Sequence, residues 1–194
     1  MNKAVFLDRD GTINEDVNYL TNKDDLVILP GVKDALSRLK ELGFLNIVIT
    51  NQSAIARGYI TEDILHDIHK EMDNVLKNDG RSLIDKFYYS PYHVDGTVKE
   101  FTGESDDRKP GTGMIDKAVK DFDVEKAESF LVGDSLVDMQ CAENAGLKKI
   151  LVLTGYGTKT QEECLNYGIT VDYVAKDLTD AVSYIEKLVN IKLI

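Results

Sequence analysis

Two aspartates separated by one residue, Asp8 and Asp10, follow a short apolar run near the start of the chain. The run, residues 4–7, consists of four apolar residues, which is typical of a buried strand. Because side chains alternate along an extended chain, we expect Asp8 and Asp10 to point the same way and Arg9 to point away. Neighbouring carboxylates repel each other, and a divalent cation with oxygen ligands is the usual compensation. The stretch therefore predicts a cation site at the end of the first strand.

Strands and helices are expected to alternate along the rest of the chain. Further strands are expected at 44–49, 85–90, 129–132 and 149–153, with a short apolar piece at 172–174. Helices are expected at 32–42, 62–77, 113–122, 136–145, 160–166 and 178–189. This alternation predicts an α/β fold, in which a central parallel sheet carries helices on both faces. A length of 194 residues suits one domain, so we expect residues 1–194 to form a single unit.

The expected helix 62–77 has a clear start and a clear inner face. Thr61 is a good N-cap, since its side-chain oxygen can accept from a free backbone N–H of the first turn. Helical spacing places six apolar side chains inward. These are Ile64, Leu65, Ile68, Met72, Val75 and Leu76.

The composition excludes some classes of function. A net charge of −11 argues against nucleic acid as a partner, although a small anionic substrate needs only a local cluster of cations. No stretch is apolar and long enough to span a membrane. The first strand is not preceded by a basic and then apolar leader, so we expect a cytoplasmic protein. The two cysteines, Cys141 and Cys164, form neither a disulfide framework nor a zinc site.

Polar residues follow the predicted strands where each strand ends. Asp8 and Asp10 follow the first strand, Thr50 the second and Asp134 the fourth, and Lys109 precedes the helix at 113–122. In open parallel sheets, ligands bind at the carboxyl ends of the strands, near a switch in strand order. Taken singly, Thr50 could merely end a strand and Lys109 could be a surface lysine. Together, these residues indicate a single site.

These residue types allow phosphoryl transfer. Asp8 is placed to attack phosphorus and form an acyl phosphate. Asp10 can protonate the leaving oxygen and later deprotonate the attacking water. The Thr50 hydroxyl and the Lys109 ammonium can hold the phosphoryl oxygens.

Two further aspartates suit a metal ion. Asp134 offers a hard oxygen for Mg²⁺, although it could also be the N-cap of the next helix. Asp138 lies one helical turn further on, where it could ligate the metal or orient a metal-bound water. Gly133 would leave the backbone close to the metal.

With these residues, the chain resembles the haloacid dehalogenase (HAD) superfamily. The resemblance is closest to the branch of the D-glycero-D-manno-heptose 1,7-bisphosphate 7-phosphatases and their histidinol-phosphate phosphatase relatives. The similar segments are 6–14, 50–58, 108–110 and 132–139, within a similarity that spans roughly residues 3–157. The resemblance implies a Rossmann-like, three-layer α/β/α HAD fold, and the short segments between motifs indicate that it has no large cap domain.

The resemblance also implies roles for individual residues. It implies a magnesium-dependent phosphatase with a phosphoaspartate intermediate, in which Asp8 is the nucleophile and Asp10 the acid/base. Thr50 and Lys109 would stabilise the phosphoryl group, and Mg²⁺ would be held by Asp8, Asp10 and Asp134. The positions that resemble substrate-binding parts of the family are Asp16, Asn18, Tyr19, Asn51, Gln52, Ser53 and Arg108.

The chain departs from the family at a metal site and at one further position. The heptose phosphatases usually hold a structural zinc through three cysteines and a histidine. The matching positions here are Ser90, Tyr92, Ser105 and Asp107, so we expect no zinc. At Ser135, relatives often have a lysine that can touch substrate.

The expected activity is hydrolysis of a sugar phosphate, and the preferred candidate is the 7-phosphate of a heptose 1,7-bisphosphate. Arg57 and Arg108 suit a second phosphate, whereas acidic residues in the loop before Lys109 leave histidinol phosphate open as the substrate. A phospho-acceptor signalling domain is the alternative from another class. Asp10 argues against it, because an acid/base promotes turnover rather than a long-lived phosphoaspartate. We expect a monomer with a small phosphorylated substrate.

Overall fold

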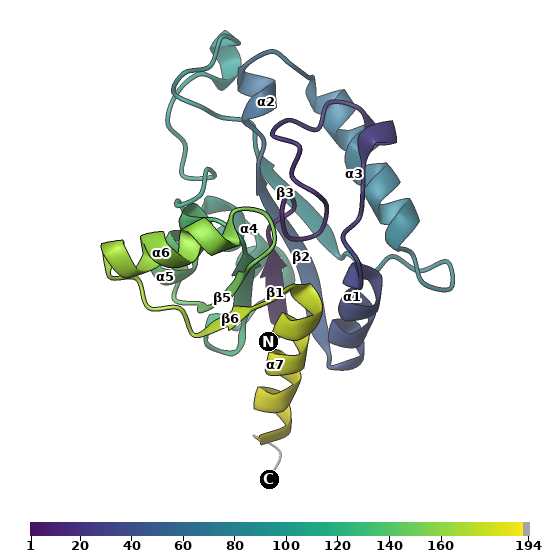
Figure 1. Ribbon diagram of the computed structural model, residues 1–194. Helices are drawn as coiled ribbons and strands as arrows, with labels where there is room; N and C mark the ends of the chain where they lie inside the picture. Colours follow the sequence, from purple (N-terminus) through teal and green to yellow (C-terminus); the bar gives the residue numbers. More distant parts are fainter. Residues whose placement is uncertain (192–194) are drawn as a thin grey trace.

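The computed structural model describes residues 1–191, and its central feature is a parallel sheet of six strands (Figure 1). The strands are β1 (Lys3–Leu7), β2 (Phe44–Asn51), β3 (Lys86–Ser90), β4 (Phe130–Gly133), β5 (Lys148–Val152) and β6 (Tyr173–Ala175). Their order is β3-β2-β1-β4-β5-β6, so the chain runs outward from β1 to one edge and then returns to β4 on its other side. The order therefore switches between β1 and β4, where such sheets bind ligands.

Helices cover both faces of the sheet, as the alternation of strands and helices predicts. The helices are α1 (Val32–Glu41), α2 (Ser53–Ala56), α3 (Glu62–Leu76), α4 (Gly113–Phe122), α5 (Leu136–Ala145), α6 (Gly157–Tyr167) and α7 (Leu178–Ile191). Val5 and Leu7 of β1 pack with α1, α3 and α7, whereas Ala4 and Phe6 point to the opposite face, toward α4, α5 and α6. The alternation of side chains along a strand thus divides the core into two layers. The predicted three-layer α/β/α fold is confirmed.

The predicted elements agree with the observed ones to within a few residues at each end, but a short helix was not expected. Residues Ser53–Ala56 form α2, a single turn of helix directly after β2. Thr61 caps α3 as predicted, because its Oγ1 accepts from the backbone N–H of Ile64 at 3.3 Å.

For two residues of α3, the prediction that they face inward was wrong. Ile64 is 39% exposed and Val75 is 48% exposed, because both lie at the edge of the apolar stripe rather than within it. The buried stripe instead includes a histidine, His69, which is only 5% exposed.

No separate lid is inserted in the part of the chain that the structure describes. The segment between Asp10 and Gly31 contains only a 3₁₀ turn at Lys23–Asp25, and it lies beside α3. The expectation of one domain over residues 1–194 stays a prediction, since 192–194 lie outside the described residues. Among residues 1–191, no helix combines the length and the apolar character needed to cross a bilayer.

A buried asparagine ties three elements of the fold together. Asn46 lies in β2 and is fully buried. Its Nδ2 donates to the carbonyl of Leu36 at 2.9 Å and to the carbonyl of Leu83 at 2.8 Å. The amide therefore binds one carbonyl within α1 and one in the turn before β3, both of which belong to buried residues.

We expect Asn46→Ala to lower the free energy of unfolding by about 2–4 kcal/mol, because two buried carbonyls would lose their donor. Urea denaturation of the two proteins measures the difference. Thr61→Ala is a suitable control, since loss of a helix cap costs about 1 kcal/mol. If Asn46→Ala lowers the free energy of unfolding by no more than the control does, water replaces the amide as the donor to the two carbonyls.

Candidate active site

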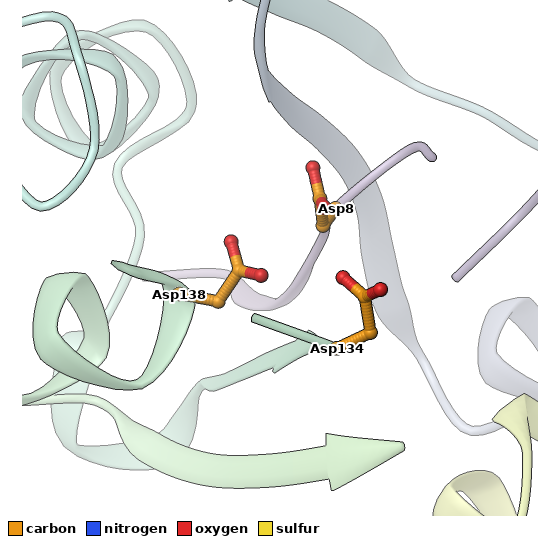
Figure 2. Close-up of side chains that lie close together, drawn as sticks. All are labelled: Asp8, Asp134 and Asp138. Atoms are coloured by element: carbon orange, nitrogen blue, oxygen red, sulfur yellow. The ribbon is translucent and has the colours of Figure 1, made fainter. Parts of the chain in front are cut away.

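Three carboxylates meet where β1 and β4 end. Because the two strands are neighbours, Asp8, which follows β1, donates its backbone N–H to the carbonyl of Val132 in β4 at 3.0 Å. Asp134 follows β4, and Asp138 lies in the first turn of α5. Figure 2 shows the three side chains turned toward one another, and one oxygen of each lies within 4.8 Å of the others. All three residues are buried.

Two glycines let backbone pack directly against Asp134. A Cβ on Gly11 would lie 2.2 Å from Asp134 Oδ2, and a Cβ on Gly155 would lie 2.0 Å from the same atom. Gly11 also has a φ of +79°, which side-chain-bearing residues rarely adopt. The loops after β1 and β5 can therefore close around the carboxylate, and the backbone N–H of Tyr156 donates to it at 2.8 Å.

Lys109 places its ammonium among the carboxylates. Its Nζ lies 2.7 Å from Asp8 Oδ1, 2.6 Å from Asp138 Oδ1 and 3.0 Å from the carbonyl of Ile49, and the residue is 3% exposed. The amide of Asn51, at the end of β2, accepts from the backbone N–H of Lys109 and donates to its carbonyl, at 3.0 and 3.1 Å. This pair of hydrogen bonds fixes the loop that carries Lys109 to the end of the sheet.

The pKa values in this cluster reflect an excess of negative charge. Burial, followed by the nearby Asp138 carboxylate, raises the pKa of Asp8 to about 7. Burial and then Asp8 raise the pKa of Asp134 to about 8. Burial alone would lower the pKa of Lys109, but Asp138 and Asp8 outweigh it and raise that pKa above its ordinary value. One ammonium cannot neutralise three carboxylates, so the site suits an additional cation.

The donor set fits a hard divalent cation. Carboxylate oxygens are the ligands that Mg²⁺ prefers, and the cluster offers no sulfur or imidazole. Asp138 is already engaged, since its Oδ1 accepts from Lys109 and its Oδ2 accepts from the backbone N–H and the hydroxyl of Ser135. Ser135, not Asp134, is the N-cap of α5. This leaves Asp8 and Asp134 as the carboxylates best placed to hold the metal.

The Asp10 carboxylate is held away from this cluster. The Arg9 guanidinium binds it with contacts of 2.8 and 2.9 Å from Nη2 and 3.2 Å from Nε. The amides of Asn14 and Gln52 each donate to it at 3.0 Å. Burial would raise the pKa of Asp10, but Arg9, Asn14 and Gln52 together lower it.

The expectation that Arg9 points away was therefore wrong. The chain turns sharply after Asp8, where the backbone N–H groups of Thr12, Ile13 and Asn14 all point to the carbonyl of Arg9. The extended geometry on which alternation depends ends at this turn. The Arg9 side chain is buried, with only 1% of it exposed.

A cavity of about 160 Å³ opens beside these groups. Its lining includes eight of the predicted site residues, which are Asp8, Asp10, Asp16, Asn18, Thr50, Asn51, Lys109 and Asp134. Gln52 lies behind the cavity, where its Nε2 donates to Thr50 Oγ1 at 2.7 Å. Ser53 begins α2 and does not line the cavity. Tyr156 lines it but was not predicted; the only signal for it in the sequence is the pair of glycines beside it after β5.

Two predicted substrate-binding residues, Tyr19 and Arg108, do not line this cavity. Arg108 belongs to a second group of side chains, together with Arg57 and His93. Tyr19 packs edge-on against Tyr59, with ring centroids 5.0 Å apart. Arg57 Nη2 lies 3.5 Å from His93 Nε2, and its buried Nε has no hydrogen-bond partner among the described residues. Arg108 donates to the carbonyl of Tyr92 at 3.1 Å. Burial, followed by the charges of Arg108 and Arg57, lowers the pKa of His93.

At three of the four positions that match the family's zinc ligands, side-chain contacts hold the loop before Lys109, whereas the buried Ser90 hydroxyl has no hydrogen-bond partner among the described residues. Tyr92 packs edge-on against Phe101, with ring centroids 6.0 Å apart. The Asp107 carboxylate accepts from Lys117 of α4 at 2.5 Å, and its backbone N–H donates to Ser105 Oγ at 3.2 Å. Ser90 ends β3 and is buried.

Comparison with known proteins agrees with this geometry. Residues 107–181 match the model of the HAD-hydrolase-like family. The chain is 41% identical to the D-glycero-beta-D-manno-heptose-1,7-bisphosphate 7-phosphatase of Haemophilus ducreyi, over 94% of this chain and 98% of that protein. It is 37% identical to the D-glycero-D-manno-heptose-1,7-bisphosphate 7-phosphatase of Thermosynechococcus vestitus, over 94% of each protein.

A solved structure of similar sequence contains the expected metal. The D,D-heptose 1,7-bisphosphate phosphatase of B. bronchiseptica, complexed with magnesium and phosphate, superposes with a TM-score of 0.84 at 32% identity, over 96% of this chain and 99% of that one. Similarity of this extent is found over nearly the whole of each chain, together with the carboxylate cluster at the switch in strand order. The protein belongs to the HAD superfamily, in the family of the D-glycero-D-manno-heptose-1,7-bisphosphate 7-phosphatases.

Proposed function

We propose that this protein is a Mg²⁺-dependent phosphatase that removes the 7-phosphate of D-glycero-D-manno-heptose 1,7-bisphosphate through a phosphoaspartate. The observation that carries the proposal is the buried contact of 2.7 Å between Lys109 Nζ and Asp8 at the carboxyl end of β1, with Asp134 beside it. Phosphoryl transfer needs a nucleophilic carboxylate, an ammonium group for the phosphoryl oxygens and a cation site. We infer the substrate from the relatives, which are D-glycero-D-manno-heptose-1,7-bisphosphate 7-phosphatases.

The reaction takes two steps. In the first, Asp8 attacks phosphorus while the bond to the sugar oxygen breaks, and Asp10 gives that oxygen a proton. In the second, water attacks the phosphoaspartate, returns a proton to Asp10 and releases phosphate. Because the Asp10 carboxylate is engaged by Arg9, we propose that Asp10 offers its backbone carbonyl to the metal alongside the Asp8 and Asp134 carboxylates. Bound there, Mg²⁺ would neutralise charge on the phosphoryl oxygens.

Thr50 and Lys109 are the proposed donors to the phosphoryl group. The Thr50 hydroxyl accepts from Gln52, so its own proton is free to point into the cavity. Asp138 keeps the Lys109 ammonium in place, since it binds Nζ at 2.6 Å and is itself held by Ser135. We assign Asp16, Asn18 and Tyr156 to the sugar, because they line the same cavity as the catalytic groups.

The second phosphate is assigned to the cluster of Arg57, His93 and Arg108. Buried Arg57 Nε lacks a partner among the described side chains, and a phosphate oxygen would supply one. Arg108 is next to Lys109 in the chain, so this cluster adjoins the loop that carries the catalytic ammonium. A histidinol amine is a cation, and it would be repelled by the same cluster. The cluster therefore favours a bisphosphate over histidinol phosphate.

A phospho-acceptor signalling domain is less well supported. Such a domain needs a phosphoaspartate that survives, whereas Asp10 here lines the same cavity as Asp8, where an acid/base would promote turnover. We further propose that the protein works as a monomer in the cytoplasm.

We expect Asp8→Asn to abolish phosphate release from the heptose bisphosphate, because an amide cannot attack phosphorus. Initial rates of phosphate release measure the loss, and an unchanged thermal unfolding midpoint in the presence of Mg²⁺ shows that the fold is intact. Retention of more than about a few per cent of wild-type turnover would contradict covalent catalysis, which otherwise supplies several orders of magnitude.

Mg²⁺ should stabilise the protein more at about pH 8 than at about pH 6. The folded pKa values of Asp8 and Asp134, about 7 and about 8, lie above the ordinary value of 3.8. The folded state without metal therefore keeps protons that the unfolded state has released, and its stability falls as pH rises through this range. Mg²⁺ replaces those protons, so its benefit grows with pH.

Thermal unfolding with and without saturating Mg²⁺ at the two pH values measures this difference. Asp134→Asn should remove most of the Mg²⁺ effect at both pH values, because it removes a ligand. An equal gain in the wild type at both pH values would contradict the raised pKa values.

Activity should disappear when EDTA removes the metal, and metal analysis should find no stoichiometric zinc.

Arg108→Ala should lose about 10- to 100-fold in kcat/KM on the heptose bisphosphate, the value of one charge-assisted contact. On a sugar monophosphate the loss should be small, because no second phosphate is present. Arg81→Ala, which removes an exposed arginine elsewhere, controls for net charge. Equal losses on both substrates would show that Arg108 does not bind the second phosphate.

A further inference from the structure

We propose that His69 of α3 is a positioning residue for Asp10, acting through the buried guanidinium of Arg9. This inference rests on the phosphatase activity proposed above and adds to it a residue that lies outside the cavity. His69 is 60 positions away from Arg9 in the chain, and it touches neither the carboxylate cluster nor the cavity beside it.

Arg9 presents a fixed fork to Asp10. Its Nη2 contacts both carboxylate oxygens, at 2.9 and 2.8 Å, and its Nε contacts Oδ1 at 3.2 Å. A planar guanidinium in this arrangement fixes the plane of the carboxylate as well as its position. The orientation of Asp10 therefore depends on the orientation of Arg9, which makes three of the five side-chain contacts to the carboxylate.

His69 holds the far side of that guanidinium. Its Nε2 lies 3.3 Å from Arg9 Nη1, the nitrogen that Asp10 does not use. Arginine can only donate, so Nε2 must accept, and the imidazole must be neutral with its proton on Nδ1. Burial, followed by the charge of Arg9, lowers the pKa of His69 to about 3, which agrees with a neutral ring.

The imidazole is itself held by packing. It stacks on Phe87 of β3, with ring centroids 4.5 Å apart and planes inclined by 15°. Tyr89 of the same strand packs edge-on, with centroids 6.1 Å apart. His69 is 5% exposed, so it has little freedom to turn. A chain of fixed contacts thus runs from β3 through His69 and Arg9 to Asp10.

An apolar side chain at position 69 would preserve this packing but not the contact. Arg9 is 1% exposed, so water cannot readily replace a lost acceptor for Nη1. The guanidinium would then turn toward another acceptor, and the Asp10 carboxylate would move with it. A misplacement of about 1 Å in a catalytic group can cost about 10²-fold in rate.

The two steps of the reaction distinguish a misplaced Asp10 from a general loss of folding or activity. With a sugar phosphate, the breaking P–O bond needs a proton from Asp10. With p-nitrophenyl phosphate, nitrophenolate leaves without one. In the second step, water forms the new P–O bond, the bond between phosphorus and the Asp8 oxygen breaks, and Asp10 takes the proton of the water. A misplaced Asp10 should therefore slow the second step with either substrate, but not the release of nitrophenolate.

The experiment compares His69→Phe, which keeps the ring stacked on Phe87 but lacks an acceptor, with His69→Gln, which keeps an acceptor. Rapid mixing with p-nitrophenyl phosphate measures the nitrophenolate burst and the steady-state rate. For His69→Phe we expect a burst rate within about threefold of wild type, a steady-state rate at least about tenfold lower, and accumulation of phosphoenzyme. His69→Gln should recover most of the steady-state rate, and Asp10→Asn should show the same pattern as His69→Phe, more severely.

His66→Phe is the matched control, since His66 lies one turn earlier on α3, is exposed and contacts Tyr89 instead. It should leave both rates unchanged. Equal losses in burst and steady state for His69→Phe, or equal behaviour of His69→Phe and His69→Gln, would overturn the proposal, because either result points to packing alone.

If His69→Phe does not fold, as judged by thermal unfolding, Arg9→Lys decides the question. Lysine keeps the charge but cannot form the fork, so the same split between burst and steady state is expected, and wild-type rates would overturn the proposal. Failure of the proposed function would be distinct, because the wild type itself would then release no phosphate from any of the substrates.

Discussion

One buried ammonium faces three buried carboxylates, and this imbalance of charge determines what the active-site end of the sheet can do. Lys109 neutralises part of the charge of Asp8 and Asp138, whereas Asp134 has, among residues 1–191, only the backbone N–H of Tyr156 as donor. Buried like charges are costly unless a cation joins them. The excess negative charge therefore favours binding of a divalent cation at the place where phosphoryl oxygens must be held.

The scaffold around this cluster is built to resist the repulsion. Adjacent β1 and β4 bring Asp8 and Asp134 together, and Gly11 and Gly155 allow two loops to close over them without a side chain in the way. Asn51 fastens the loop that carries Lys109 to the end of β2. These constraints come from four different strands, so the site forms only when the sheet has assembled.

The sequence predicted those parts of the site that depend on strand ends. Asp8, Thr50 and Asp134 could be placed together because parallel strands present their carboxyl ends at one edge. Directions of side chains beyond a strand end could not be placed, and Arg9 is the example: its path depends on a turn that local alternation does not describe. Tyr156 and His69 were missed for a related reason. Each reaches its partner through tertiary packing, which the residue types in their own segments do not reveal.

Net charge also constrains the substrate. A protein with a charge of −11 repels an anion at long range, so a bisphosphate must be drawn in by cations near the cavity. Screening limits such attraction to about 8–10 Å in ordinary salt, which means that scattered lysines on the outer surface contribute little. Arg108, adjacent to Lys109 in the chain, and Arg57, beside His93, are the candidates for this attraction. In the function proposed here, the carboxylates and Mg²⁺ would hold the phosphate that reacts, and a separate group of cations would hold the one that does not. In an acidic protein this division lets one end of the substrate be anchored without adding positive charge to the reacting centre.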